Sequence, residues 1–284
     1  MGNFTKNLSE HFSIRGPKIG FCAICRTHGT LTKDHVPPQA CGNISDVVIR
    51  DVYGENLAQQ RRPFVSQGGF HFKTICAKCN NTLLGAAYDP ALITVVQEIQ
   101  AYLTRASASR LMLPRTHLFE YQPNKFLRSV LGHLLAANAV SDVKNNTVEA
   151  PLDAALRSYV LNDSEVLPDS VYVYYWLYPY RRQVIMKHGG MGFQGSRGEL
   201  IYGHVFKFFP FGFWVVWNEQ TNSGTQRINL PRLDLDSSSS ISATVRLAIN
   251  FWPLQLSNFP EAPPDDGMWL VADHLVSQAE NKIK

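Results

Sequence analysis

Two Cys-x-x-Cys motifs enclose an Asp-His pair near the start of this chain. The first motif is Cys22-Ala-Ile-Cys25 and the second is Cys76-Ala-Lys-Cys79. Two intervening residues let both sulfur atoms of a pair bind one metal ion, and four thiolates form the closed, tetrahedral coordination of a structural Zn²⁺. A disulfide-bonded secreted scaffold would be shorter and richer in cysteine, so zinc in a reducing compartment is favoured. The fifth cysteine, Cys41, is expected to be a small hydrophobic residue.

The Asp-His pair, Asp34 and His35, could perform acid–base and metal chemistry. A carboxylate is a hard ligand suited to Mg²⁺ or Mn²⁺, and histidine is a general base that titrates near neutral pH. Adjacent residues of a strand point to opposite faces, so both can serve one site only if the backbone bends there. Pro37-Pro38 follows directly and gives the chain a reason to leave regular pairing. Asn80 follows the last cysteine, so the zinc site would position its amide.

This composite pattern resembles the HNH endonuclease family over about residues 20–90. The resemblance implies a ββα-metal fold, in which two strands and a helix surround one divalent ion. It also implies that His35 deprotonates the attacking water and that Asp34 and Asn80 bind a catalytic Mg²⁺ or Mn²⁺. That ion would contact the scissile phosphate and stabilise the leaving oxyanion, and one product would keep a 5′-phosphate.

The middle position of the family motif is occupied differently in this chain. The family usually has an asparagine about five residues before the second cysteine pair, where this chain has His71. His71 could orient His35 or contact the phosphate. Asn56, which also lies between the two cysteine pairs, is the other candidate, so the middle role stays open between His71 and Asn56.

Each candidate catalytic residue also has a structural interpretation. Asp34 could cap a turn before the prolines, and His35 could be a buried, hydrogen-bonded histidine. His71 lies between two phenylalanines and could simply be packed. Asn80 could cap a helix that begins there. The combination of both cysteine pairs with the Asp-His pair favours the catalytic interpretation.

The composition is that of a folded globular protein. Hydrophobic residues make up 45% of the 284 residues and charged residues 18%, which excludes a disordered chain. The net charge of +4 is compatible with a polyanionic partner. The most apolar run, residues 206–217, is interrupted by Pro210 and Gly212 and is shorter than the ~20 residues that span a bilayer. Since residues 1–18 also lack the apolar core of a signal peptide, we expect a soluble, cytoplasmic protein without a membrane partner.

The elements that would position these residues can be predicted from periodicity and punctuation. Helices are expected from Asp89-Pro90, from Pro123, over residues 151–160 and over residues 268–278. Strands are expected where β-branched and aromatic residues concentrate, at residues 47–52, 171–178, 183–186, 199–209, 213–217 and 225–230. Gly68-Gly69 is expected to form a turn before residues 70–75.

Together these features predict an α+β fold. It has a zinc-stabilised ββα-metal module, a helical middle and an antiparallel, β-rich C-terminal part. Residues 1–110 would form the nuclease module and residues 111–284 an accessory or regulatory region. The resemblance to HNH endonucleases implies hydrolysis of phosphodiester bonds in DNA, and the layout of a small HNH module with a larger second region resembles nucleases of anti-phage defence and restriction systems. Two alternatives stay open: a non-catalytic zinc module that binds nucleic acid or protein, and a nuclease active only when a regulatory protein or small ligand binds the C-terminal region.

Overall fold

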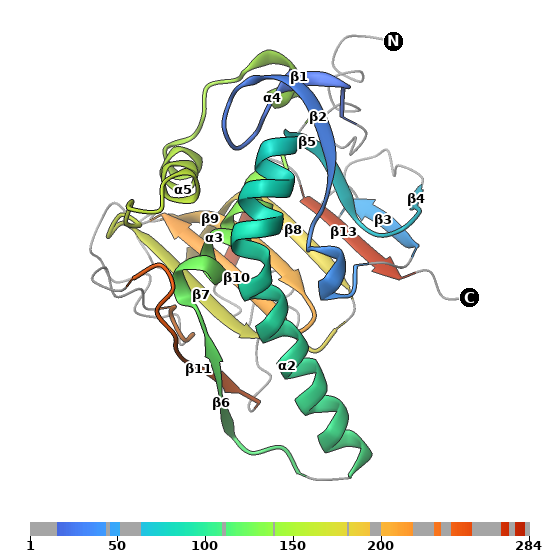
Figure 1. Ribbon diagram of the computed structural model, residues 1–284, viewed down its shortest axis with the longest axis vertical. Helices are drawn as coiled ribbons and strands as arrows, with labels where there is room; N and C mark the ends of the chain where they lie inside the picture. Colours follow the sequence, from blue (N-terminus) through green and yellow to red (C-terminus); the bar gives the residue numbers. More distant parts are fainter. Residues whose placement is uncertain are drawn as a thin grey trace.

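The structure is a computed structural model of the chain (Figure 1), and it describes residues 16–43, 46–51, 64–109, 112–138, 140–180, 182–193, 200–217, 230–233, 240–251, 268–272 and 276–281. The expected mixture of helices and sheets is confirmed.

A small antiparallel sheet forms the N-terminal part of the molecule. It contains β1 (Ile19–Phe21), β2 (His28–His35) and β5 (His71–Cys76) in the order β1-β2-β5. Residues 36–70 separate β2 from β5 in the sequence, and the two strands form an antiparallel pair in which Leu31 lies opposite Cys76. We call this pair the β2–β5 hairpin. The turn expected at Gly68-Gly69 lies directly before β5.

One continuous helical segment follows the second cysteine pair. It comprises η3 (Lys78–Tyr88), wound as a π-helix, and α2 (Asp89–Ala108). The helix expected from Asp89-Pro90 is thus confirmed as α2, but Asp89 does not cap it, because the chain is already helical before this residue. Tyr88 already has helical dihedral angles, and the Asp89 side chain makes no capping hydrogen bond. Pro90, which has no backbone N–H to donate, lies where the π-helical winding changes to α-helical winding.

A large antiparallel sheet forms the other side of the molecule. Its strand order is β4-β3-β13-β8-β9-β10-β7, and β12 also pairs with β8. The strands are β3 (Val47–Asp51), β4 (Phe64–Ser66), β7 (Val171–Leu177), β8 (Gln183–Phe193), β9 (Leu200–Phe208), β10 (Phe211–Trp217), β12 (Met268–Ala272) and β13 (Val276–Asn281). The strands expected at residues 47–52, 171–178, 183–186, 199–209 and 213–217 are confirmed as β3, β7, β8, β9 and β10. The strand expected at residues 225–230 falls on residues 225–229, which lie outside the described part.

The helix expected over residues 268–278 is wrong, because this segment contributes two strands. Met268–Ala272 pairs with β8, and Val276–Asn281 pairs with both β8 and β3. Such partners are distant in sequence, and local periodicity cannot reveal them. The pairing of β13 with β3 also means that strands from both sides of residue 110 belong to the same sheet.

The remaining helices and a separate two-stranded sheet complete the described fold, namely η1 (Gln39–Cys41), α3 (Pro123–Ala136), α4 (Val140–Asn145), α5 (Pro151–Leu161), β6 (Thr116–Tyr121) and β11 (Val245–Asn250). The helices expected from Pro123 and over residues 151–160 are thus confirmed as α3 and α5.

Helix α3 lies at the centre of the molecule, behind α2 in the view of Figure 1. Its residues 126–136 are all buried. Phe126 packs against Phe211 and Phe213 of β10, with ring centroids 5.5 and 5.9 Å away. On the side facing η3, a Cβ at Gly132 would collide with Leu84, so a glycine permits the close approach of the two helices. Among the described residues, no helix is both long and apolar enough to cross a membrane.

Candidate functional site

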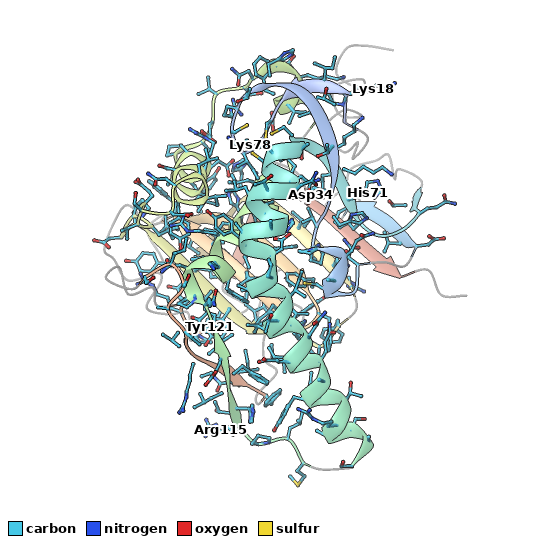
Figure 2. The ribbon with its side chains drawn as sticks, in the orientation of Figure 1. Lys18, Asp34, His71, Lys78, Arg115 and Tyr121 are labelled. Carbon is cyan, nitrogen blue, oxygen red and sulfur yellow. The ribbon has the colours of Figure 1, made fainter. Side chains whose placement is uncertain are left out.

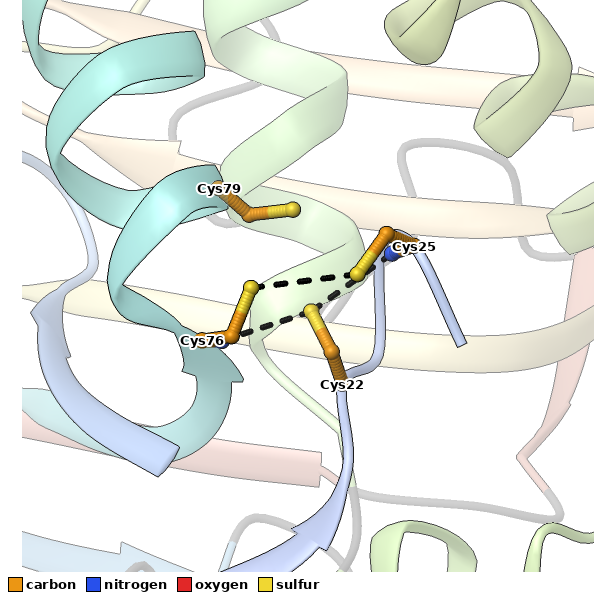
Figure 3. Close-up of side chains that lie close together, drawn as sticks. All are labelled: Cys22, Cys25, Cys76 and Cys79. Carbon is orange, nitrogen blue, oxygen red and sulfur yellow. Dashed lines mark hydrogen bonds between the residues drawn. The ribbon is translucent and has the colours of Figure 1, made fainter. Parts of the chain in front are cut away.

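Four cysteine side chains converge where the loop after β1 meets the junction of β5 and η3 (Figure 3). The Sγ atoms of Cys22, Cys25, Cys76 and Cys79 all lie within 4.8 Å of one another, and those of Cys25 and Cys76 are 3.8 Å apart. Tetrahedral zinc with Zn–S bonds of about 2.3 Å requires Sγ–Sγ separations of about 3.8 Å. The predicted convergence of these cysteines is confirmed, and the cluster could bind a metal ion such as zinc.

The electrostatics of the cysteine cluster also suit a metal. Hydrogen bonds, foremost the one from the Cys79 side chain, lower the pKa of the Cys22 thiol to about 5. The backbone N–H groups of Cys76 and Cys25 also donate to Cys22 Sγ, at 3.3 and 3.5 Å. These donors favour the thiolate that metals bind. Cys41 lies outside the cluster and is buried, which raises the pKa of its thiol and fits its expected role as a small hydrophobic residue.

His35 and His71 face each other across the β2–β5 hairpin. They are directly opposite in the strand register, with ring centroids 5.6 Å apart. His35 Nε2 lies 3.1 Å from the carbonyl oxygen of Gly68, and the Gln39 amide is 3.2 Å from the same nitrogen. The Gly68 carbonyl can only accept a hydrogen bond and Gln39 Nε2 can only donate one, so the two contacts require opposite protonation states of His35 Nε2 and do not fix its tautomer. Burial lowers the pKa of His35, so its neutral form predominates at neutral pH.

The turn before β5 holds both histidines. His71 Nδ1 donates to Gly69 O at 3.2 Å and lies 3.4 Å from Ser66 Oγ. Gly68 and Gly69 have φ values of 72° and 104°, which glycine adopts without the steric cost of a Cβ. At Gly69 a Cβ would also collide with Asn43. The two glycines therefore permit the turn that presents the Gly68 carbonyl to His35.

Asn43 fixes this turn, and the motif pattern did not point to it. Its Nδ2 donates to Pro37 O and Phe70 O, and its Oδ1 accepts from Phe70 N, each at 2.7 Å. Only 1% of Asn43 is exposed. The side chain thereby joins the segment after β2 to the start of β5, and its Oδ1 also accepts from Gln183 Nε2 at 3.4 Å. No spacing rule identifies Asn43, because its partners are backbone groups and one side chain 140 positions away.

The structure places Asp34 on the face of β2 opposite to His35. The pairing with β5 shifts register between Thr32 and Asp34, yet Asp34 still pairs with buried Phe72 while His35 pairs with His71. Asp34 is itself buried, and Figure 2 shows it beside the upper half of the long helix. Its Oδ2 lies 2.9 Å from Nδ1 of His133, a residue of α3. The local irregularity of β2 therefore does not bring the two side chains onto one face.

His133 joins two carboxylates in the core. Its Nε2 lies 3.0 Å from Asp89 Oδ1, which also accepts a 2.7 Å hydrogen bond from Ser129 Oγ. Burial alone would lower the pKa of His133, but the charges of Asp34 and Asp89 raise it to about 10. Burial likewise favours the neutral form of Asp89, whereas the His133 charge lowers the pKa of that carboxyl. At neutral pH the group is an imidazolium between two carboxylates.

Asn80 contacts the backbone next to Asp34. Its Nδ2 donates to Lys33 O at 2.6 Å and to Thr32 Oγ1 at 3.1 Å. Thr32 Oγ1 donates its own proton to Ile75 O, so it can only accept from Asn80. Both N–H groups of the amide are therefore used, and Oδ1 is the atom left to bind a ligand.

The predicted site residues thus fall into two groups. His35 and His71 share one face of the hairpin, whereas Asp34 lies on the other and Asn80 touches the strand beside it. Asn56, the alternative for the middle position, lies outside the described residues. Their catalytic and metal-binding roles stay predictions.

A second buried cluster was not predicted because its members come from three separate elements. Asp153 accepts from His188 Nε2 at 2.8 Å and from His204 Nε2 at 2.9 Å, beside a cavity of about 110 Å³. These groups lie close enough to hold a metal ion. However, His204 Nδ1 accepts the backbone N–H of His188, so its Nε2 must keep the proton. Lys187 Nζ, 3.6 Å from Asp153, adds a positive charge that opposes a cation there.

Comparison of the chain with protein-family models, with curated proteins and with solved structures finds no match. The sequence pattern and the geometry described above are therefore what supports a function.

Proposed function

We propose that the protein is a metal-dependent HNH-type endonuclease that hydrolyses phosphodiester bonds in DNA. The observation that carries the proposal is the state of His35. Burial lowers its pKa, so His35 is a neutral, partly exposed imidazole opposite His71, and one of its ring nitrogens is unprotonated and can act as a base. A histidine in this state can take a proton from a water that attacks phosphorus. His71, on the same face, would orient His35 or contact the phosphate.

Two metal ions belong to the proposal. The four cysteines would hold a structural Zn²⁺, which joins the hairpin to the helical segment and does no chemistry itself. Asp34 Oδ1 and Asn80 Oδ1 would bind a catalytic Mg²⁺ or Mn²⁺, for which carboxylate and amide oxygens are suitable ligands. When bound, that ion supplies stabilisation of the negative charge that develops on the leaving oxygen.

The test is cleavage of plasmid and of single-stranded DNA with Mg²⁺, Mn²⁺ or a chelator. Wild type should cut only with added metal, and His35→Ala should lower the rate by roughly 10²-fold or more while retaining zinc. His28→Ala is the matched control, because His28 lies exposed at the other end of β2 and should not affect cutting. Cleavage that survives both chelation and His35→Ala would exclude this mechanism. DNA binding without any cleavage would support a non-catalytic zinc module instead.

A further inference from the structure

We propose that His133 is a positioning residue that orients the Asp34 carboxylate for the catalytic ion, so that α3 contributes directly to the nuclease centre. The inference rests on the proposed function, because it concerns the same ion site. It assigns a role to a residue that is 99 positions from Asp34 in sequence and outside the cysteine-bounded stretch.

The hydrogen bond from His133 determines which oxygen of Asp34 can bind a metal. Oδ2 accepts from His133 Nδ1 at 2.9 Å, and among the described residues none donates to Oδ1. A carboxylate bound at one oxygen loses its freedom to rotate and presents the other oxygen in a defined direction. Metal-binding carboxylates in proteins are commonly supported by such hydrogen bonds from a second group.

The orientation of the His133 ring is itself fixed. Its far nitrogen is bound to Asp89 Oδ1 at 3.0 Å, and Ser129, one turn earlier on α3, donates to the same oxygen. The His133 side chain is only 1% exposed. The ring is therefore held at both nitrogens and cannot turn without breaking a charged hydrogen bond in the core.

The experiment separates the two bonds of His133 with two isosteric variants. The amide nitrogen of Asn occupies the place of histidine Nδ1, whereas that of Gln occupies the place of Nε2. His133→Asn should thus retain the bond to Asp34, and His133→Gln should retain only the bond to Asp89. Binding of Mn²⁺ to the full-length, zinc-loaded protein would be titrated by electron paramagnetic resonance, without DNA. His133→Gln should weaken Mn²⁺ binding about 10- to 100-fold, and His133→Asn should stay close to wild type, although each variant loses one buried bond.

The outcomes distinguish this inference from the nuclease proposal. Unchanged or tighter Mn²⁺ binding in His133→Gln, or equal losses in both variants, overturns the positioning role and leaves the nuclease proposal standing. Mn²⁺ binding that Asp34→Asn does not affect overturns the ion site and the inference together. If either histidine variant fails to fold, wild type labelled with ¹⁵N-histidine is titrated with Mg²⁺. The His133 Nδ1 signal should then shift, and an unmoved signal overturns the inference.

Discussion

The buried group of His133, Asp34 and Asp89 makes a prediction about stability at alkaline pH. His133 has a pKa of about 10 in the folded protein, against 6.5 for an ordinary histidine. A group whose folded pKa is raised contributes stability that is complete below the unfolded pKa and is lost as the pH rises through the folded value. The loss should therefore occur between about pH 6.5 and pH 10.

The expected size of the effect follows from these two pKa values. Proton linkage gives a contribution of about 4 kcal/mol at pH 7 and about 1.5 kcal/mol at pH 9. Wild type should thus lose about 2.5 kcal/mol of unfolding free energy from this one group over two pH units. The lowered pKa of Asp89 keeps its carboxyl ionised throughout this range, so it adds no slope of its own.

Urea denaturation of zinc-loaded wild type and His133→Asn at pH 7, 8 and 9 measures this effect. Tyrosine and cysteine titrations are common to both proteins and cancel in the difference between their unfolding free energies. That difference should shrink as the pH rises. A constant difference would show that His133 is not charged between the carboxylates, and a growing difference would contradict the sign of the argument.

Two further predictions concern the cysteine cluster and the turn beside His35. Cys76→Ser should reduce bound zinc from one ion per chain to less than stoichiometric amounts by elemental analysis, whereas Cys41→Ser should keep it; equal zinc in both would refute the four-cysteine site. Asn43→Ala should lower the unfolding free energy by about 3 kcal/mol, because it leaves the backbone of Phe70 without its partner in the core. Urea denaturation checks this against Asn145→Ala, an exposed control at the end of α4, and equal stabilities of the two variants would contradict it.

Local signals in the sequence were enough to predict much of the fold. The apolar stripe of α3 and the aromatic run of β7 each arise from one element that contacts the core along its whole length, so periodicity identifies them. The convergence of the cysteines was predictable from their spacing, because two Cys-x-x-Cys pairs are typical of a four-thiolate metal site. In contrast, residues 268–281 form strands whose partners are distant in sequence, and no local pattern contains that information.

Asp89 shows why a correct local rule can fail. An Asp-Pro pair is a typical helix start, but here the carboxylate is bound to His133 and Ser129 of α3 rather than to the backbone of its own helix. α2 does begin at Asp89, but it continues the π-helical segment that starts at Lys78, so no free helix end is left for Asp89 to cap. A short polar side chain can bond to the backbone of its own helix or to side chains of a neighbouring helix, and here only the position of α3 distinguishes the two roles.

The separation of Asp34 from His35 follows from the geometry of strands, and it determines what the site requires. Alternation predicts opposite faces for the pair, and β2 retains that alternation despite its irregular register. Each residue then needs support from its own side: the turn at Gly68 holds His35, and α3 holds Asp34. The second support lies far along the chain and in the region expected to be accessory. A nuclease centre built this way would depend on the docking of α3 as much as on the cysteine cluster, and the Asp-His pair alone could not reveal that dependence.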